Sequence, residues 1–309
     1  MHIELSGKQA VVSGSTAGIG YAIAKGLAAA GARVVINGRD ERRVSGALDK
    51  LQTELPGATV SGVAADLGTA QGVHHFAAHV PRADVLVNNL GIFDPKPFLE
   101  IDDTEWERFF QVNVMSGVRL SRQYLPGMIE RDWGRIVFIS SESGVQIPVE
   151  MVHYGMTKTA QLAVSRGLAE TVAGTGVTVN AVLPGPTRSE GVSEFFGKLA
   201  GERGVSLESL EAEFIQQNRP SSLIRRLAEV EEVPTWSSTS ARRKLRPPRA
   251  RRYASMAGLS ARSCKSSMPP LLFSPGLPGR SIHVILCYPF GYIHRKTNHG
   301  QHISARRKR

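Results

Sequence analysis

Short apolar runs alternate with longer helix-forming stretches over the first 233 residues of the chain. The apolar runs, which predict strands buried on both faces of a sheet, lie at residues 9–13, 34–37, 60–64, 85–87, 136–140 and 177–183. The helix-forming stretches lie at residues 21–30, 40–55, 104–127 and 154–174. Strands and helices that alternate at this spacing form parallel βαβ units with right-handed crossovers. The pattern therefore predicts a protein of the α/β class with one doubly wound parallel sheet.

The pattern changes after Val233. Residues 237–252 are basic and contain few large apolar side chains, and prolines between positions 247 and 289 would interrupt any long helix. The apolar run at residues 282–293 contains a histidine and a proline and is too short to span a bilayer. We therefore expect a folded domain over residues 1–233 and an irregular, disordered basic tail over residues 234–309.

The charge of the chain divides at the same point. The formal net charge of +11 suggests an anionic partner such as nucleic acid. However, the tail holds 16 of the 38 Lys and Arg residues and no Asp or Glu, which leaves 22 basic and 27 acidic residues in the first 233. Both cysteines, Cys264 and Cys287, also lie in the tail, so the domain can have neither a disulfide nor a Cys-ligated metal site. Since nothing at the N-terminus resembles a signal peptide, we expect a cytoplasmic protein without a membrane segment.

A glycine-rich loop follows the first apolar run. Its sequence is Ser13-Gly14-Ser15-Thr16-Ala17-Gly18-Ile19-Gly20, and a helix-forming stretch comes next. The glycines permit a tight turn and a close approach to an anion, and the helix N-terminus offers free N–H groups and the positive end of its dipole. A plain turn would fit the loop taken alone. Its place after the first strand of a βαβ unit favours a dinucleotide site, hence a Rossmann-type domain.

Further motifs follow in order. Asn88-Asn89-Leu90-Gly91 comes after the fourth apolar run, and Ser141 comes after the fifth. Tyr154-Gly-Met-Thr-Lys158 begins 13 residues beyond Ser141. With the Gly-x-x-x-Gly-x-Gly loop, these motifs resemble the short-chain dehydrogenase/reductase family, which has Thr where this chain has Ser13 and Ala where it has Leu90. The resemblance covers about residues 5–233 and implies an NAD(P)-dependent oxidoreductase, with a 3-oxoacyl reductase-like substrate as one possibility.

The resemblance implies roles for four catalytic residues. Tyr154 would exchange a proton with the substrate oxygen, and Ser141 would hydrogen-bond to that oxygen. Lys158 would bind the nicotinamide ribose, and Asn113 would support a proton relay through water. Tyr and Lys at positions i and i+4 share one helix face. A phenol with a pKa of about 10 is a poor base at neutral pH. We therefore expect the Lys158 ammonium to lower the pKa of Tyr154.

The same resemblance implies the cofactor contacts. They are Gly14, Ser15, Gly18, Ile19, Gly20, Arg39, Asp66, Leu67, Asn88, Gly91, Tyr154, Lys158, Pro184, Gly185 and Thr187. An acidic residue after the second strand selects NAD, whereas an Arg there accommodates the phosphate of NADP. This chain has Gly38 at the family's acidic position, followed by Arg39 and Asp40. NADP(H) is expected, and NAD(H) remains the alternative because Asp40 opposes a phosphate.

Other candidate groups are weaker. His74, His75 and His79 lie on a helix without a ligand-spaced carboxylate cluster, so we expect a helix surface and no metal. His153 could line the site or face solvent. Glu142 and Ser143 are expected at the edge of the pocket. Residues 191–218 resemble the family's substrate-covering helices, although ordinary packing would explain them equally.

The tail departs from the family pattern. Members continue past the position of Val233 with a helix and a last strand near Thr-Gly-Ala-x-x-x-Val-Asp-Gly-Gly, and this chain lacks both. When allowed codons for residues 250–263 are read in a shifted frame, they can spell Ala-Ala-Leu-Arg-Val-Asp-Gly-Gly-Leu-Val-Arg-Ser-Ile. Residues 234–240 can likewise give Asn-Met-Val-Val-Tyr-Leu. Our hypothesis is a frameshift near codon 233; the alternative is a genuine tail that binds nucleic acid or another anionic surface.

A missing last strand and helix have a structural consequence. The sheet edge beside the sixth strand and an apolar patch on one face would lie open. Family members are commonly tetramers that use these elements, so the homo-oligomer that the resemblance implies is in doubt. The expected partner is a small carbonyl or alcohol substrate. The alternatives are a non-catalytic nucleotide-binding protein and a protein whose basic tail binds nucleic acid.

Overall fold

The computed structural model describes residues 4–234 and the backbone of residues 284–286. The expected irregular tail therefore lies outside the described residues, apart from Pro234 and residues 284–286. Six strands lie within two residues of the predicted runs at each end. They are β1 (Gln9–Val12), β2 (Arg33–Gly38), β3 (Val60–Ala64), β4 (Val85–Asn88), β5 (Gly134–Ile139) and β6 (Val177–Leu183).

The strands form one parallel sheet of the predicted doubly wound type. Its order is β3-β2-β1-β4-β5-β6-β9, where β9 is Val284–Leu286. Val12 of β1 stands between Ile36 of β2 and Val87 of β4. Because the chain crosses from the β3 edge to β4, the strand order reverses between β1 and β4. In such sheets a crevice for ligands opens at the carboxyl ends of these two strands.

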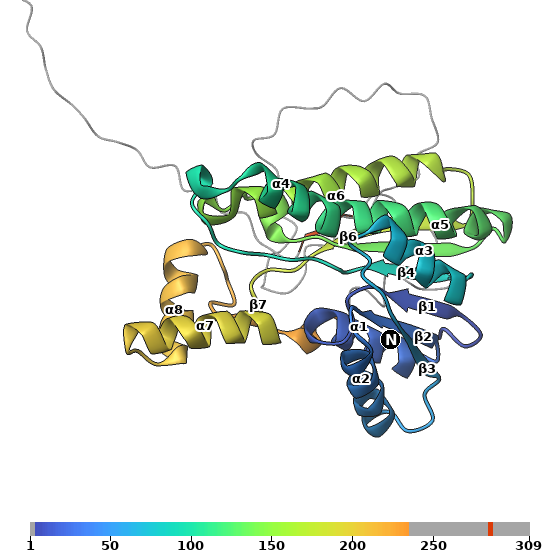
Figure 1. Cartoon of the computed structure of the whole chain (residues 1–309), viewed down its shortest axis with the longest axis horizontal. Helices are drawn as coiled ribbons and strands as arrows, with labels where there is room; N and C mark the ends of the chain where they lie inside the picture. Colours follow the sequence, from blue (N-terminus) through green and yellow to red (C-terminus); the bar gives the residue numbers. More distant parts are fainter. Residues whose placement is uncertain (1–3, 235–283, 287–309) are drawn as a thin grey trace, which may run out of the picture.

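Helices cover both faces of the sheet (Figure 1). The helices are α1 (Gly18–Ala29), α2 (Glu41–Glu54), α3 (Ala70–His79), α4 (Asp103–Phe110), α5 (Ser116–Glu130), α6 (Val152–Thr171), α7 (Glu190–Arg203) and α8 (Leu207–Asn218). The helical stretch predicted near 104–127 is confirmed, and a π-helical turn at Gln111–Met115 joins α4 to α5 within it. Among the described helices, none is long and apolar enough to cross a membrane.

Two apolar layers hold the domain together. On one face, Ile23 and Leu27 of α1 and Leu51 of α2 pack against the strands. On the other face, Phe76 of α3 and Leu120 of α5 do the same. Each of these side chains is completely buried, and burial of one such side chain contributes about 1.5–3 kcal/mol.

The edge beside β6 differs from the expectation. Ala181, Val182 and Leu183 of β6 pair in parallel register with β9, so the edge is covered over these three residues. The expected open apolar patch is also absent from the described strands, because Val137, Ile139 and Val182 are at most 4% exposed. These three belong to the same buried cluster as α1 and Val233. The prediction of an open edge was therefore wrong over Ala181–Leu183, and the prediction of an open apolar patch was wrong at Val137, Ile139 and Val182.

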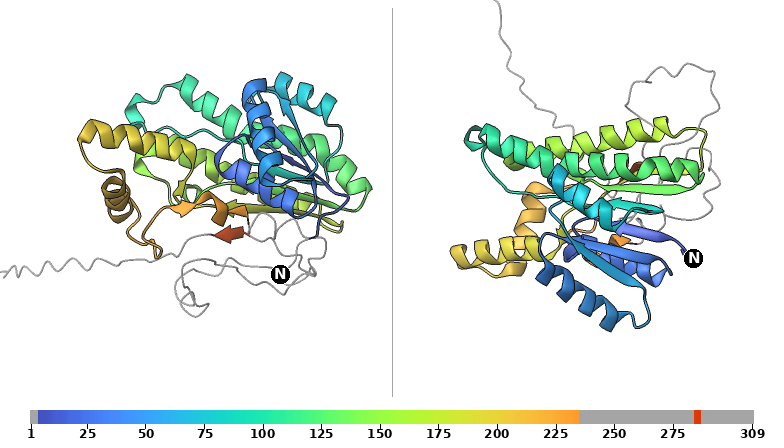
Figure 2. Two further views of the ribbon diagram at one scale, coloured as in Figure 1. Left: turned by 90° about the horizontal axis from the view of Figure 1, so that it is seen from below. Right: turned by 45° about the vertical axis from the view of Figure 1, so that its right-hand side comes forward.

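Helices α7 and α8 form a separate lobe beside the sheet, which Figure 2 shows from two sides. Phe196, Leu210 and Ile215 make up most of its small core. Gly204 ends α7 in the left-handed conformation, with φ of 64°, where a glycine carries no steric penalty. The short strands β7 (Thr187–Arg188) and β8 (Ala228–Glu229) pair in parallel at the base of the lobe.

Candidate active site

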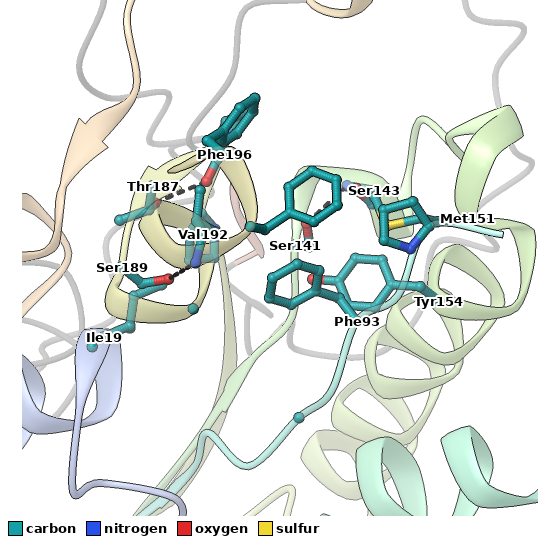
Figure 3. Close-up of a pocket in the computed structure, with 18 of the residues that line it drawn as sticks. Ile19, Phe93, Ser141, Ser143, Met151, Tyr154, Thr187, Ser189, Val192 and Phe196 are labelled. Carbon is teal, nitrogen blue, oxygen red and sulfur yellow. Dashed lines mark hydrogen bonds between the residues drawn. The ribbon is translucent and has the colours of Figure 1, made fainter. Parts of the chain in front are cut away.

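A cavity of about 540 Å³ opens between the carboxyl ends of the central strands and the α7–α8 lobe. The glycine-rich loop borders one end, and Ser141, Tyr154 and Lys158 lie within its wall. Figure 3 shows Tyr154 of α6 and Phe93 on one side, and Val192 and Phe196 of α7 facing them. The predicted catalytic serine, tyrosine and lysine thus meet at one cavity.

The glycine-rich loop needs its glycines for two reasons. Gly14 and Gly18 adopt φ values of 58° and 56°, which disfavour other residues. A Cβ atom at Gly20 would collide with the Gly14 carbonyl oxygen and the Asn89 amide. Ala17, at the N-cap of α1, supplies no side-chain hydrogen bond to the helix. The loop therefore fits the phosphates of a dinucleotide, which bind to free N–H groups at a close-packed helix N-terminus.

Asn37 and Asn89, which the sequence reasoning did not single out for the loop's geometry, hold it in place. Asn37 Oδ1 accepts from the Gly14 N–H at 3.2 Å, and Ser15 Oγ accepts from the Asn37 N–H at 3.0 Å. Asn89 Nδ2 donates to the carbonyl oxygens of Ser13 and Gly14 at 3.0 and 2.8 Å. Because Ser15 is completely buried in this network, its hydroxyl shapes the loop from behind.

Tyr154 and Ser141 are hydrogen-bonded to each other in the cavity wall. The Ser143 N–H donates to Ser141 Oγ at 3.1 Å. Burial raises the pKa of Tyr154 to about 12, and its hydrogen bond with Ser141 opposes this rise. The Phe93 ring stands edge-on to the Tyr154 ring, with their centroids 6.5 Å apart. The phenol is therefore protonated at neutral pH.

Lys158 does not act on Tyr154 as the sequence predicts. Its Nζ donates to the Ile139 carbonyl oxygen at 3.0 Å and lies 5.5 Å from the centre of the Tyr154 ring. Burial lowers the pKa of Lys158 to about 8. The expected lowering of the Tyr154 pKa is wrong for this structure, because desolvation of the phenol is the dominant effect.

Asn113 lies in the π-helical turn and is completely buried. Its Nδ2 donates to the Ile92 carbonyl oxygen and to Thr157 Oγ1, both at 3.0 Å, and its Oδ1 accepts from the Ile92 N–H at 2.8 Å. Gln161 Nε2 donates to its main-chain carbonyl at 2.6 Å. Asn113 therefore links the loop that follows β4 to helix α6, and it lies behind the residues that line the cavity.

The other predicted cofactor residues divide into two groups. Those that line the cavity are Gly14, Gly18, Ile19, Gly20, Gly91, Tyr154, Lys158, Pro184, Gly185 and Thr187. Those that do not line it are Ser15, Arg39, Asp66, Leu67 and Asn88. Asn88 turns away and donates to Ser121 Oγ at 3.1 Å, while its neighbour Asn89 lines the cavity.

An acidic side chain at the end of β2 would require Thr16 to move. A Cβ atom at Gly38 would lie 2.6 Å from Thr16 Cγ2. Arg39 is exposed directly after the strand. Asp40 caps α2, where its carboxylate accepts from the Arg43 N–H at 2.8 Å. The carboxylate that seemed to oppose a phosphate is thus engaged with its own helix.

Glu142 edges the cavity as expected, but its partner was not foreseen. Arg219 Nε donates to Glu142 Oε1 at 2.7 Å, and both side chains are only 9% exposed. Burial raises the pKa of Glu142, and Arg219 opposes this rise. No local pattern marks Arg219, since its partner is 77 residues away in the chain.

The histidines can now be placed. His74, His75 and His79 lie on the exposed surface of α3, as predicted. His153 neither lines the cavity nor faces solvent, so both interpretations were wrong. It is completely buried against Phe109, with ring centroids 4.0 Å apart. Helix α4 covers α6 at this point, which the sequence of α6 alone does not reveal.

Comparison with known proteins identifies the family. A family model described as short chain dehydrogenase matches residues 8–199. The chain is 49% identical over 233 residues to the uncharacterized oxidoreductase YvaG of Bacillus subtilis, covering 75% of this chain and 88% of the relative. It is 30% identical over 250 residues to D-beta-hydroxybutyrate dehydrogenase of Cupriavidus necator, covering 78% and 95%.

Solved structures give the same result. A structure of L-sorbose reductase from Gluconobacter frateurii, complexed with NADPH and L-sorbose, has a TM-score of 0.74 and 30% sequence identity. The match covers 79% of this chain and 92% of that one. With the glycine-rich loop, Ser141, Tyr154 and Lys158 at one cavity of a doubly wound sheet, this chain belongs to the short-chain dehydrogenase/reductase family of oxidoreductases.

Proposed function

We propose that the protein transfers a hydride between NADP(H) and a carbonyl or secondary alcohol substrate, with Tyr154 as the acid/base group. The observation that carries the proposal is the convergence of Ser141, Tyr154 and Lys158 on the cavity that the glycine-rich loop borders. A nicotinamide cofactor, when bound, exchanges the hydride. The protein supplies the binding surface, the orientation and the proton.

The protonation state of Tyr154 favours carbonyl reduction. With its pKa raised to about 12, the phenol holds its proton at neutral pH and can give it to a substrate oxygen. Ser141, bonded to the same phenol, would hold that oxygen. Lys158 lies beside Gly91, where a Cβ atom would be 3.3 Å from its Nζ. Its ammonium would bind the ribose of the cofactor there.

Preference for NADP(H) is supported by the end of β2. Gly38 stands where an acidic residue would bind a ribose hydroxyl, a Cβ atom there would press on Thr16, and the exposed Arg39 can bind a phosphate. L-sorbose reductase and a 3-oxoacyl (acyl-carrier-protein) reductase from Agrobacterium tumefaciens are similar structures that contain NADPH and NADP, respectively. NAD(H) is the alternative cofactor.

The test is consumption of NADPH and NADH with a panel of ketones. Tyr154→Phe should lower kcat by at least about 100-fold, the size of a lost general acid. Arg39→Ala should lower kcat/KM for NADPH while leaving that for NADH nearly unchanged. Undiminished activity in Tyr154→Phe would refute the proposed mechanism. An equal effect of Arg39→Ala on both cofactors would refute the NADP(H) preference.

A further inference from the structure

Three charged side chains form a polar wall beside the reacting groups. We call Glu142, Glu150 and Arg219 the carboxylate wall; all three line the cavity. Arg219 bonds to Glu142 at 2.7 Å, and its Nη1 lies 4.0 Å from Glu150 Oε1. The charges of Glu142 and Arg219 both act on the Tyr154 phenol. A substrate whose carbonyl reaches Tyr154 therefore lies within electrostatic reach of this wall.

The wall has more carboxylates than cations. Arg219 is neutralised by Glu142, and the other arginine that lines the cavity, Arg203, lies 4.0 Å from Glu213. Neither guanidinium is left without a carboxylate neighbour to bind a substrate carboxylate or phosphate, which needs such a cation. The third carboxylate, Glu150, has a buried Oε1 with no hydrogen-bond partner in the described part of the chain. The wall thus carries an excess of negative charge, which repels anions.

The opposite side of the cavity is apolar. Phe93, Val192, Phe196 and Phe214 line it, and Phe196 and Phe214 pack edge to face at 5.2 Å. A carbon skeleton can lie against these side chains. On the other side, an unsubstituted hydrocarbon chain would displace water from the charged side chains of the wall, which is costly. Hydroxyl groups next to the carbonyl would replace part of that hydration.

We propose that the carboxylate wall makes this enzyme select neutral hydroxylated ketones, and the corresponding polyols, over substrates that carry a carboxylate or phosphate. This inference rests on the proposed carbonyl–alcohol chemistry. The Glu142–Arg219 pair also ties the α8 end of the lobe to the residue after Ser141. A purely structural role would predict equal effects on every substrate, so substrate ratios distinguish the two roles.

The experiment compares kcat/KM for two matched ketone pairs, using the full chain and NADPH. Acetoacetate and its methyl ester differ in charge, whereas 2-butanone and hydroxyacetone differ by a hydroxyl group. The wild type should prefer the ester over acetoacetate, and hydroxyacetone over 2-butanone, each by about tenfold or more, the size expected of one charge or hydrogen bond. Equal rates within the pairs, or a preference for acetoacetate, would overturn the inference.

Variants of opposite sign make the test specific. Glu150→Gln, which leaves the buried pair intact, and Glu142→Gln should each reduce the preference for the ester by about tenfold. Arg219→Gln should increase it. Glu208→Gln, exposed on α8 outside the cavity, is the matched control and should not change the ratio. Ratios that stay constant in all three wall variants would assign the wall a structural role only. Failure of every ketone with the wild type would overturn the proposed function itself.

Discussion

Replacement of Lys158 by Met should stabilise the protein while it weakens the proposed binding of NADPH. Lys158 is 4% exposed, and burial lowers its pKa from 10.5 to about 8. At 1.36 kcal/mol per pKa unit, the folded state at neutral pH carries a penalty of about 3 kcal/mol for this buried ammonium. Met keeps the apolar stem and removes the charge. The lost hydrogen bond to Ile139 costs about 1 kcal/mol, so Lys158→Met should be about 2 kcal/mol more stable at pH 7.

The pH dependence of this stability difference shows whether the buried ammonium of Lys158 causes it. Between about pH 8 and 10.5, the unfolded chain still binds a proton at Lys158 that the folded protein has released. The stability of the wild type therefore rises with pH through this window relative to the variant. The advantage of Lys158→Met should shrink above pH 8 and fall to about zero near pH 10, where the remaining penalty of the ammonium about equals the lost hydrogen bond.

Urea unfolding of the wild type and Lys158→Met at pH 7, 8, 9 and 10 measures the difference in their free energies of unfolding. The titration of groups that both proteins share cancels in this difference. Lys198→Met, on the exposed side of α7, controls for a surface methionine and should change stability by less than about 0.5 kcal/mol. A stability difference that is constant from pH 7 to 10, or a variant less stable than the wild type at pH 7, would refute the reasoning.

Three further predictions concern the loop, the reaction and the tail. Gly20→Ala should lower the urea midpoint of unfolding and raise KM for NADPH at least about tenfold, because the alanine Cβ atom would collide with the Gly14 carbonyl oxygen. An unchanged KM would contradict the proposed role of the glycine-rich loop in binding the cofactor. In the pH profile of reduction, Tyr154 remains protonated up to pH 9, whereas Lys158 loses its charge above about pH 8. KM for NADPH should therefore rise above pH 8 while kcat at saturating NADPH changes little. A kcat that falls between pH 7 and 8 would speak against Tyr154 as the proton donor. Repeated nucleotide sequencing across codon 233 should reveal a displaced reading frame, and an unbroken frame would leave the genuine tail as the explanation.

The strands were predictable from the sequence because each is an apolar run bounded by turn residues. In a parallel sheet covered on both faces, burial requires such runs regardless of tertiary detail. The helical stretch near 104–127 was predictable, but the π turn within it was not, because one extra residue leaves the composition and most of the periodicity unchanged. That turn determines where Asn113 points, so its side-chain contacts could not be read from the sequence.

The proposed catalytic residues could be located from the sequence because their spacing is local to one helix and one strand end, whereas their electrostatics could not be predicted. Whether Lys158 lowers the pKa of Tyr154 depends on which acceptor the ammonium reaches and on how dry the phenol is. The structure directs the ammonium to the Ile139 carbonyl and buries the phenol. Spacing at i and i+4 establishes proximity but not the balance between charge and desolvation.

The residues that sequence reasoning missed are those whose partners lie far along the chain. Asn37 bonds to Gly14 across 23 residues, and Arg219 pairs with Glu142 across 77. Both contacts join the carboxyl end of a strand to a segment that follows another element. The carboxyl ends of the strands are the region in which doubly wound sheets bind ligands. The fold thus provides a fixed position for the reaction, through Ser141 and Tyr154 beside the glycine-rich loop. The Glu142–Arg219 pair and Glu150 lie beside that position, so the proposed substrate preference should change with substitutions at Glu142, Glu150 and Arg219 before it changes with substitutions at Ser141 and Tyr154.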